Sequence, residues 1–421
     1  MKFQFKAIYI SEIAILCIFL NYYCFNIIFG HLIPFGTYIF YGIAIIGVLI
    51  SAYKEPIRFG FDIKCWIGYF LLSVATIPIA MSKKYAIDGL ADYLQRLILI
   101  ILIAYICEKE KSIIYAIRLL SITAAACAIS TLLTMNDFSQ KLTVSSGASI
   151  STNDVGSLMA YGCFAILFAF GVGEKSRLHK TVIKIAYIIA AIVVISVAGS
   201  RKSIIAIFIL FIAMFLFCAR DYFKQMTMLR FIGILILCAV AFYFVYTYLL
   251  PNYEDTNLFI RTAGRGAERT AESDEGRIEL YKMAMEYFGD NLFFGLGFNN
   301  FSYKVGGYTH STYVESLACS GLLGLLYLIP YIHILINQIK LSFAKSINSD
   351  RKNRTRQKEL LAFYIAFLFV GIGIPYIYKD IPCVVLAMFI ASQKNSFARL
   401  NEKDIGDINE SKTNKSVVSS S

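Results

Sequence analysis

The feature that most constrains this chain is a series of long apolar runs, repeated from the N-terminus almost to the C-terminus. A membrane-spanning helix needs about 20 consecutive apolar residues, and runs of that order fill most of the chain. Hydrophobic residues make up 58% of the 421 residues and charged residues only 16%, whereas soluble domains carry about 25% charged residues. The sequence therefore excludes a soluble globular protein, and its high hydrophobicity excludes a disordered one.

The apolar runs number about twelve and predict an all-α polytopic membrane protein. The first run lacks a small-residue cleavage site and is longer than a signal-peptide core, so we interpret it as a span. The last two runs are short and contain Pro375 and Pro382, so they can alternatively form one broken hairpin. The runs lie near residues 7–28, 32–52, 65–80, 89–106, 112–134, 155–173, 183–198, 203–219, 229–250, 312–336, 359–375 and 381–392.

The distribution of lysine and arginine predicts the orientation of these spans. If the N-terminus lies in the cytoplasm, the inner segments carry 26 of these residues and the outer segments 12. Cytoplasmic segments are normally the basic ones, so both termini are expected in the cytoplasm. The same bias explains the net charge of +12 without a nucleic-acid partner. The ten cysteines lack C-x-x-C spacing and are interpreted as buried hydrophobic residues.

The chain divides into four predicted parts. They are a transmembrane bundle of about nine spans at 1–250, a large extracytoplasmic loop at 251–311, C-terminal spans at 312–393, and a disordered cytoplasmic tail at 394–421. Loops as long as 251–311 are uncommon unless they have a function. This loop contains nine acidic and six basic residues, so any anion site there depends on the local placement of arginines.

A short amphipathic helix is predicted within the loop, over residues 277–288. Its apolar face is expected to carry Ile278, Tyr281, Met285 and Phe288, and its polar face Glu279, Lys282 and Glu286. Ser273 and Asp274 are the predicted N-caps, and Gly289 is predicted to end the helix. Such a helix would lie on the membrane surface or over the mouth of the bundle.

Two arginines in this outer region are candidates for binding phosphate. Arg201 lies at the predicted outer mouth of the eighth span, where it is either an anchor that snorkels to the interface or a bidentate phosphate ligand. Arg277 opens the loop helix, where it is either a solvated charge paired with a neighbouring glutamate such as Glu275 or a second phosphate donor.

His310 is the candidate general base. It follows Gly306 and Gly307 just before the tenth span, and an ordinary imidazole pKa near 6.5 suits acid–base work. The other three histidines, His31, His179 and His333, are interpreted as structural. Glu315 lies five residues further on, and carboxylates within spans are rare and usually partnered. Asp92 and Arg96, four residues apart on one helix face, are interpreted as a structural ion pair.

Several motifs are absent from the sequence. The outer loop has no Asp-x-Asp, and the chain has no Walker loop, no His/Cys metal spacing and no G-x-S-x-G elbow. We therefore expect neither a metal nor a cofactor. Because nucleotides are not found outside the membrane, a lipid-linked phosphate is the natural anionic substrate for arginines on that side.

The order of these motifs resembles the O-antigen ligase and polymerase family of bacterial surface polysaccharide assembly. The resemblance covers about 199–325, and the N-terminal half matches only as a hydrophobic pattern. One departure is the lack of a tryptophan in the loop helix, where Tyr281 or Tyr287 can stand in. The matching pieces in chain order are Ser200-Arg201, Gly276-Arg277, Phe294-Gly295-Leu296-Gly297-Phe298-Asn299, His310-Ser311 followed by Glu315, and Gly321 with Gly324.

The resemblance implies a metal-independent, inverting glycosyltransferase on the outer face of the bacterial cytoplasmic membrane. Its donor would be an oligosaccharide on undecaprenyl pyrophosphate, and its acceptor a sugar hydroxyl. Arg201 and Arg277 would hold the pyrophosphate, and His310 would activate the acceptor. Supporting roles would fall to Glu315, Glu275, Gly295 and Gly297. The lipid bilayer is the other expected partner, and a chain-length regulator protein is a further candidate partner.

Three functions remain open at this point. The leading one is polymerisation of repeat units into capsule, exopolysaccharide or O-antigen, and the closest alternative is a ligase that moves finished glycan to another acceptor. A flippase for lipid-linked oligosaccharide belongs to a different class. Transporters place charges at mid-bilayer and often show internal repeats, whereas these charges gather at the predicted outer edge.

Overall fold

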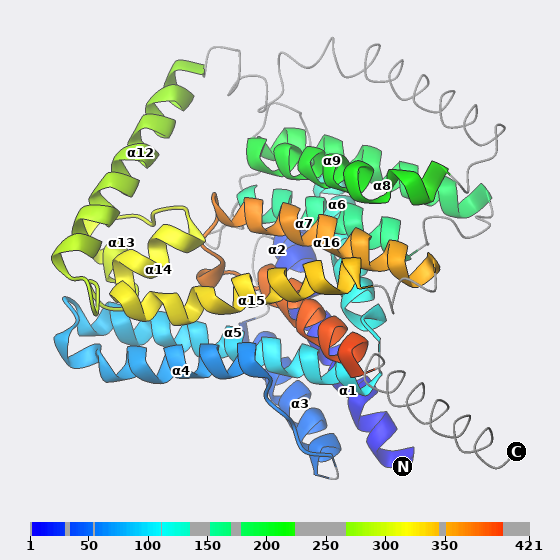
Figure 1. Cartoon of the computed structure of the whole chain (residues 1–421), viewed down its shortest axis with the longest axis horizontal. Coiled ribbons are helices and arrows are strands. Elements are labelled where there is room, and N and C mark those ends of the chain that lie inside the picture. Colours follow the sequence, from blue (N-terminus) through cyan, green and yellow to red (C-terminus); the bar gives the residue numbers. More distant parts are fainter. Residues whose placement is uncertain are drawn as a thin grey trace, which may run out of the picture.

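The computed structural model describes residues 2–29, 34–53, 55–110, 112–134, 152–169, 178–223, 267–344 and 351–398. Within these ranges the regular structure is helical and contains no strand, in agreement with the all-α prediction (Figure 1). Where their residues are described, the predicted apolar runs fall mainly on helix, and the run 229–250 lies outside the described residues. Residues 399–421, most of the predicted tail, also lie outside them.

The first half of the chain supplies the larger share of the bundle. Its elements are α1 Lys2–Leu20, η1 Asn21–Phe25, α2 Asn26–Phe29, α3 Pro34–Ala52, α4 Phe61–Ala75, η2 Ile77–Ile79, α5 Lys83–Lys109, α6 Ile114–Thr134, α7 Thr152–Ala169, α8 Leu178–Ala198 and α9 Arg201–Phe223. The second half adds α12 Ala267–Asp290, α13 Asn300–Val305, α14 Thr312–Ser320, η4 Gly321–Leu323, α15 Gly324–Phe343, α16 Arg351–Gly371, η6 Tyr376–Tyr378 and a last helix, Ile381–Ala398.

Six stretches of the described chain are long and apolar enough to cross a membrane. They are Ala7–Phe25, Lys83–Lys109, Ile114–Thr134, Arg201–Cys218, Thr312–Phe343 and Ile381–Ala398. Three shorter apolar helices accompany them, Gly36–Ala52, Asn153–Phe168 and Val182–Ala198. The chain is therefore a multi-pass membrane protein by composition and helix length, and the total of about twelve spans stays a prediction.

The long helices lie side by side, with a smaller group of elements at one end (Figure 1). α15 packs between α4 and α16, and α16 packs on α9. Their shared core is rich in tyrosine, whose hydroxyls find partners inside it: Tyr69 pairs with Ser320 at 2.8 Å and Tyr161 with Tyr376 at 2.7 Å. A buried hydroxyl without a partner is costly, so these pairs fix how the helices pack.

The small group at the end, here called the cap, comprises residues 267–320. Its own apolar cluster is separate from the main core and contains Leu280, Ala284, Leu296, Phe301 and Cys319. α12 packs against α14 through this cluster. The cap is therefore a folded unit seated on the bundle, and part of the predicted long loop (251–311) forms it.

α12 differs from the predicted loop helix in two ways. It begins at Ala267, before the predicted N-caps, and continues through Gly289 to Asp290. These cap and end predictions were wrong because helix-favouring residues precede Ser273, and a single glycine costs a helix only about 1 kcal/mol.

The inward face of α12 is also shifted. Leu280, Ala284 and Tyr287 pack on the cap cluster, whereas Ile278 and Met285 are 55% and 45% exposed. The prediction ranked residues by hydrophobicity. It therefore missed that the small side chain of Ala284 lets α14 pack closely against this face of α12.

The predicted tenth span, 312–336, is broken into α14 and α15. Gly321 adopts a left-handed φ of 58°, and a Cβ there would lie 2.5 Å from the Leu292 oxygen. At Gly324 an added Cβ would lie 2.3 Å from the Ser316 oxygen. The amide of Leu322 donates to the same Leu292 oxygen at 2.8 Å. The break therefore lets the segment after α12 dock onto the start of the span, which a hydropathy pattern cannot predict.

The last two apolar runs form two separate helices rather than one broken hairpin. α16 and the helix Ile381–Ala398 are joined by residues 372–380, here called the connector. The last helix continues into the first five residues of the predicted tail. The connector lies at the same end of the bundle as the cap, and it organises the site described next.

Candidate functional site

His310 lies between α13 and α14 with a backbone φ of 59°, in the left-handed region. A non-glycine residue pays about 1–2 kcal/mol to adopt that conformation. Asn299 is the other non-glycine residue in the described part of the chain with a positive φ. Strained backbone of this kind persists only where neighbouring contacts hold it, and such residues cluster at functional sites.

Those contacts come from the two residues that flank His310. The buried Thr309 donates its amide to Glu315 Oε2 at 2.8 Å, and its hydroxyl contacts the Ser311 backbone. Ser311 is the N-cap of α14 and accepts from the Val314 amide. The left-handed turn is therefore held from both sides by α14.

Glu315 is itself 1% exposed and fully engaged. Besides the Thr309 amide, it accepts from the Tyr378 hydroxyl at 3.3 Å and from Cys319 Sγ at 3.6 Å, both through Oε1. Glu315 therefore positions the turn that carries His310, and its carboxylate is buried and does not face a cavity. Its predicted supporting role remains a prediction that this geometry fits.

The surroundings of His310 lower its pKa to about 4. Burial is the largest cause, followed by the positive charges of Arg277, Lys202 and Lys379, each of which disfavours the imidazolium. The imidazole is therefore neutral at pH 7. Cations on α9, α12 and the connector thus lie near enough to act on the charge of this histidine.

Arg201 is the first residue of α9, as its predicted place at a span mouth requires. It follows a tight turn in which Gly199 has a φ of 63° and the buried hydroxyls of Ser200 and Ser203 meet at 2.7 Å. Gly156 of α7 lets this turn approach closely, because a Cβ there would lie 2.4 Å from Ser203 Oγ. The turn thus fixes the backbone of the half-buried Arg201, which is followed by Lys202.

Arg277 is half-buried on α12, one helical turn before Tyr281. Residues four apart share a helix face, so the two side chains lie together. Burial raises the pKa of Tyr281, and the charge of Arg277 opposes this shift. This face of α12 points toward the connector, since the Tyr281 hydroxyl donates to the Ile372 oxygen at 3.1 Å.

Three successive carbonyl oxygens of the connector tie three helices together. They belong to Ile372, Gly373 and Ile374, and each accepts from a different helix. The donors are Tyr281 of α12 at 3.1 Å, Lys202 Nζ of α9 at 2.6 Å and the Thr312 hydroxyl of α14 at 2.6 Å. The elements that carry Arg277, Arg201 and His310 are therefore fixed to one short segment.

Two ion pairs fix the connector's far end to the bundle. Lys379 contacts the buried Asp154 of α7 at 2.8 Å, and Asp380 contacts Arg96 Nε of α5 at 3.2 Å. The predicted Arg96–Asp92 pair is present as well, with 3.8 Å between Nη1 and Oδ2. Sequence analysis missed this role of the connector, and a lysine–aspartate pair beside a proline was the only local signal.

Gly295 and Gly297 mark a close approach of backbones. Both have positive φ, and a Cβ on Gly295 would lie 2.5–2.7 Å from the backbone of residues 318–320. A Cβ on Gly297 would lie 2.6 Å from Ala80 Cβ. Leu296, between them, donates its amide to Ala318 and accepts from Met81. In this structure the two glycines let the segment after α12 dock onto α14 and onto the residues just before α5.

The remaining predicted residues divide clearly. Glu275 is exposed on α12, so it is the least enclosed of the predicted site residues. His333 contacts Asp62 at 2.7 Å and Asn337 at 3.0 Å, in keeping with its structural interpretation. His31 and the side chain of His179 lie outside the described residues.

Comparison with known families bears directly on this arrangement. The model of the O-antigen ligase family matches residues 185–329. The chain is similar to that family over this stretch, which is about a third of its length. The match covers Arg201, Arg277, His310 and Glu315, so the resemblance inferred from their order is confirmed. A search of curated proteins finds no match.

Members of the O-antigen ligase family, ligases and polymerases, are membrane glycosyltransferase-like enzymes. The matched stretch runs from α8 into α15 and includes the described part of the cap. The connector lies beyond it, so the segment that gathers α9, α12 and α14 is outside the part shared with the family model.

Proposed function

We propose that the chain polymerises oligosaccharide repeat units carried on undecaprenyl pyrophosphate, at the outer face of the bacterial cytoplasmic membrane. The products would be capsule, exopolysaccharide or O-antigen chains. The observation that carries the proposal is that one short connector ties together the helices beside a strained His310, at one end of a membrane bundle, and that nearby cations lower the pKa of this histidine. Cations around a neutral imidazole suit an enzyme that binds a pyrophosphate and accepts a proton.

In the proposed reaction His310 takes the proton of the acceptor hydroxyl. The acceptor oxygen forms a bond to the anomeric carbon, while the bond from that carbon to the pyrophosphate oxygen breaks. The electron pair leaves with undecaprenyl pyrophosphate, and attack opposite the leaving group inverts the anomeric centre. Arg201 and Arg277 stabilise the negative charge that grows on the leaving group, and this requires no metal.

The lowered pKa of His310 fits this order of events. A histidine with a pKa of about 4 is a weak base in the free protein. A bound pyrophosphate places negative charge among the three cations and offsets their effect, so the imidazole becomes more basic. Substrate binding would therefore strengthen the base when it is needed.

The second candidate is a ligase that transfers finished glycan to lipid A core or another acceptor. The description of the matching family, O-antigen ligase, favours it. Both candidates use the same donor chemistry and differ in the acceptor. The intermediate that accumulates on loss of activity separates them, since a polymerase leaves single lipid-linked units and a ligase leaves long lipid-linked chains.

The test is a His310→Ala strain in which lipid-linked glycan is measured on each face of the membrane. The proposal predicts normal protein level, no long polymer, and single repeat units on the outer face. His179→Ala, which changes a histidine of a predicted inner loop, should make polymer normally. Units trapped on the cytoplasmic face would indicate a flippase, and normal polymer from His310→Ala would remove His310 from the mechanism.

A further inference from the structure

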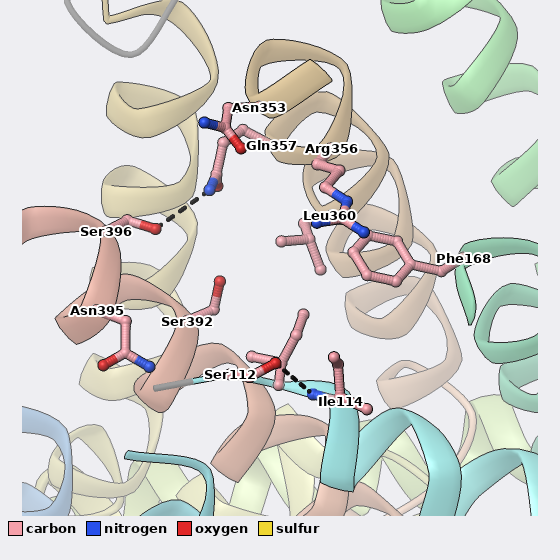
Figure 2. Close-up of a pocket in the computed structure, with 11 residues that line it drawn as sticks. Ser112, Ile114, Phe168, Asn353, Arg356, Gln357, Leu360, Ser392, Asn395 and Ser396 are labelled. Carbon is pink, nitrogen blue, oxygen red and sulfur yellow. Dashed lines mark hydrogen bonds between the residues drawn. The ribbon is translucent and has the colours of Figure 1, made fainter. Parts of the chain in front are cut away.

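A polar pocket lies at the end of the bundle opposite the cap. It is formed where α6, α16 and the last helix begin or end, with Phe168 of α7 at its edge (Figure 2). Its volume of about 120 Å³ is large enough for a polyatomic group and not only a single water. The residues that line it are Ser112, Ile113, Ile114, Phe168, Asn353, Arg356, Gln357, Leu360, Ser392, Asn395 and Ser396.

The polar groups of this pocket are mainly hydrogen-bond donors, and no carboxylate is among its described lining residues. Asn395 Nδ2 is buried and has no partner within the described chain. The Ser112 and Ser396 hydroxyls already accept from the Ile114 amide and Gln357 Nε2, so each has its own proton left to donate. Available donors in a pocket that is not lined by a carboxylate are complementary to an anion.

Arg356 supplies the positive charge at the pocket mouth. Its guanidinium lies 5.6 Å from the centre of the Phe168 ring, and a cation on an aromatic face keeps its N–H groups available in its own plane. Figure 2 shows the Arg356 side chain lying along this ring at the pocket edge. A planar guanidinium with free edges is suited to bidentate binding of a phosphate.

The neighbouring hollow at the same end has a different chemistry. Its charged lining residues are two carboxylates, Glu55 and Glu108, and three cations, Arg58, Lys109 and Lys394. Lys109 pairs with Glu55, and Lys394 pairs with Glu108. The two lysines of this hollow are thus paired within the protein, whereas no carboxylate is among the described residues that line the pocket of Arg356.

The depth of the pocket in the membrane follows from the sequence of its helices. α16 changes from a charged stretch, 351–359, to apolar residues at Leu360. The last helix changes from apolar to polar at Ser392, and α6 becomes apolar at Ile114. All three changes occur at pocket residues, so the pocket lies at the boundary of the hydrocarbon layer, where lipid phosphates reside.

We propose that this pocket binds the phosphate of an anionic phospholipid from the adjacent leaflet. Arg356 and Asn395 hold the phosphate oxygens, and the serine hydroxyls bind the remaining oxygens or headgroup hydroxyls. The exposed Ile114 at the rim lies against the lipid chain. This site is far from the cap and does not depend on the proposed glycosyltransferase activity.

The test is lipid binding to the purified full-length chain in detergent, measured by native mass spectrometry. Three probes are compared: dioctanoyl-phosphatidylglycerol, dioctanoylglycerol and inorganic phosphate. The first is expected to bind, and Arg356→Gln should weaken it about tenfold or more through loss of a charged hydrogen bond. Asn395→Leu should weaken binding as well, while Arg118→Gln, an equal charge change at an exposed position on α6 outside the pocket, should not.

Two results would overturn the inference. Equal binding of dioctanoylglycerol, or unchanged binding by both Arg356→Gln and Asn395→Leu, would show that the pocket does not recognise phosphate. Inorganic phosphate that competes as well as the lipid would assign the pocket to a free phosphate and reject the lipid. Far-ultraviolet circular dichroism of each variant shows whether it is still folded, so that a loss of lipid binding is not mistaken for unfolding.

Discussion

The two ends of the bundle both gather cations, but they hold them differently. At the cap end, Lys202 and Lys379 are tied to a carbonyl and to Asp154, and a strained His310 lies among them. At the opposite end, Arg356 lies on an aromatic ring over a pocket without carboxylates. Cations that are held in place by neighbouring groups suit a reaction in which negative charge develops on one leaving group. A cation at the open mouth of a pocket suits the binding of a phospholipid headgroup.

This difference makes it possible to distinguish two effects of a substitution in a membrane protein, loss of catalysis and loss of lipid contacts. Substitutions at the cap end should change turnover and leave phospholipid binding intact. Substitutions in the pocket of Figure 2 should do the reverse. The three predictions that follow test the cap end, from the largest expected effect to the smallest.

The largest effect is expected from Arg277→Lys. Lysine keeps the charge and loses the planar fork that binds a pyrophosphate bidentately. Removal of one well-placed donor from a charge-stabilising site costs about 10²–10³ in rate, so polymer formation should fall by that order. Lys282→Gln on the exposed side of α12 is the matched control and should leave the rate unchanged. An unchanged rate in Arg277→Lys would mean that Arg277 contributes only its charge, and a similar loss in both variants would mean that the effect is not specific to Arg277.

A smaller effect, on stability, is expected from Gly295→Ala. The positive φ alone costs about 1–2 kcal/mol for alanine, and the Cβ would also press on the backbone of residues 318–320. The melting temperature in detergent should fall. Gly289→Ala, in α12 with open space around its Cβ, should leave it unchanged or raise it slightly. Equal melting temperatures would contradict the docking role assigned to Gly295.

The smallest effect is a titration shift at His310. Because the charge of Lys202 disfavours the imidazolium, Lys202→Gln should raise the pKa of His310 from about 4 toward its ordinary value of 6.5. Between those two values the unfolded chain binds more protons, so the folded state loses stability as the pH falls through this window. Nuclear magnetic resonance of labelled histidine measures the shift, with His310→Asn to assign the signal. An unchanged pKa would place Lys202 away from the imidazole.

The sequence predicted the helices well and their contacts less well. Apolar runs locate spans because hydrocarbon excludes polar backbone, and Arg201 indeed begins α9. The break between α14 and α15 was not predicted, since apolar residues continue on both sides of Gly321 and hydropathy alone shows no interruption there. Its cause is the approach of residues 291–299, which is a tertiary contact.

The site was predicted only in part, because some of its residues come together through tertiary contacts. His310 was found because imidazole suits acid–base work, and Arg277 because guanidinium suits phosphate binding. Lys202 and Lys379 were not among the predicted site residues, because their approach to His310 depends on the folding of the connector. A segment of nine residues with one short helical turn carries no periodic pattern, so its hydrogen bonds to three helices become visible only in the structure.

The central claim is that this chain joins lipid-linked repeat units and that His310 takes the proton. The most direct measurement is chain growth by purified protein in liposomes, supplied only with repeat units on undecaprenyl pyrophosphate. The account predicts a ladder of longer glycans and release of undecaprenyl pyrophosphate from the wild type, and neither from equally folded His310→Ala. A ladder of the same length from His310→Ala, or none from the wild type, would contradict it.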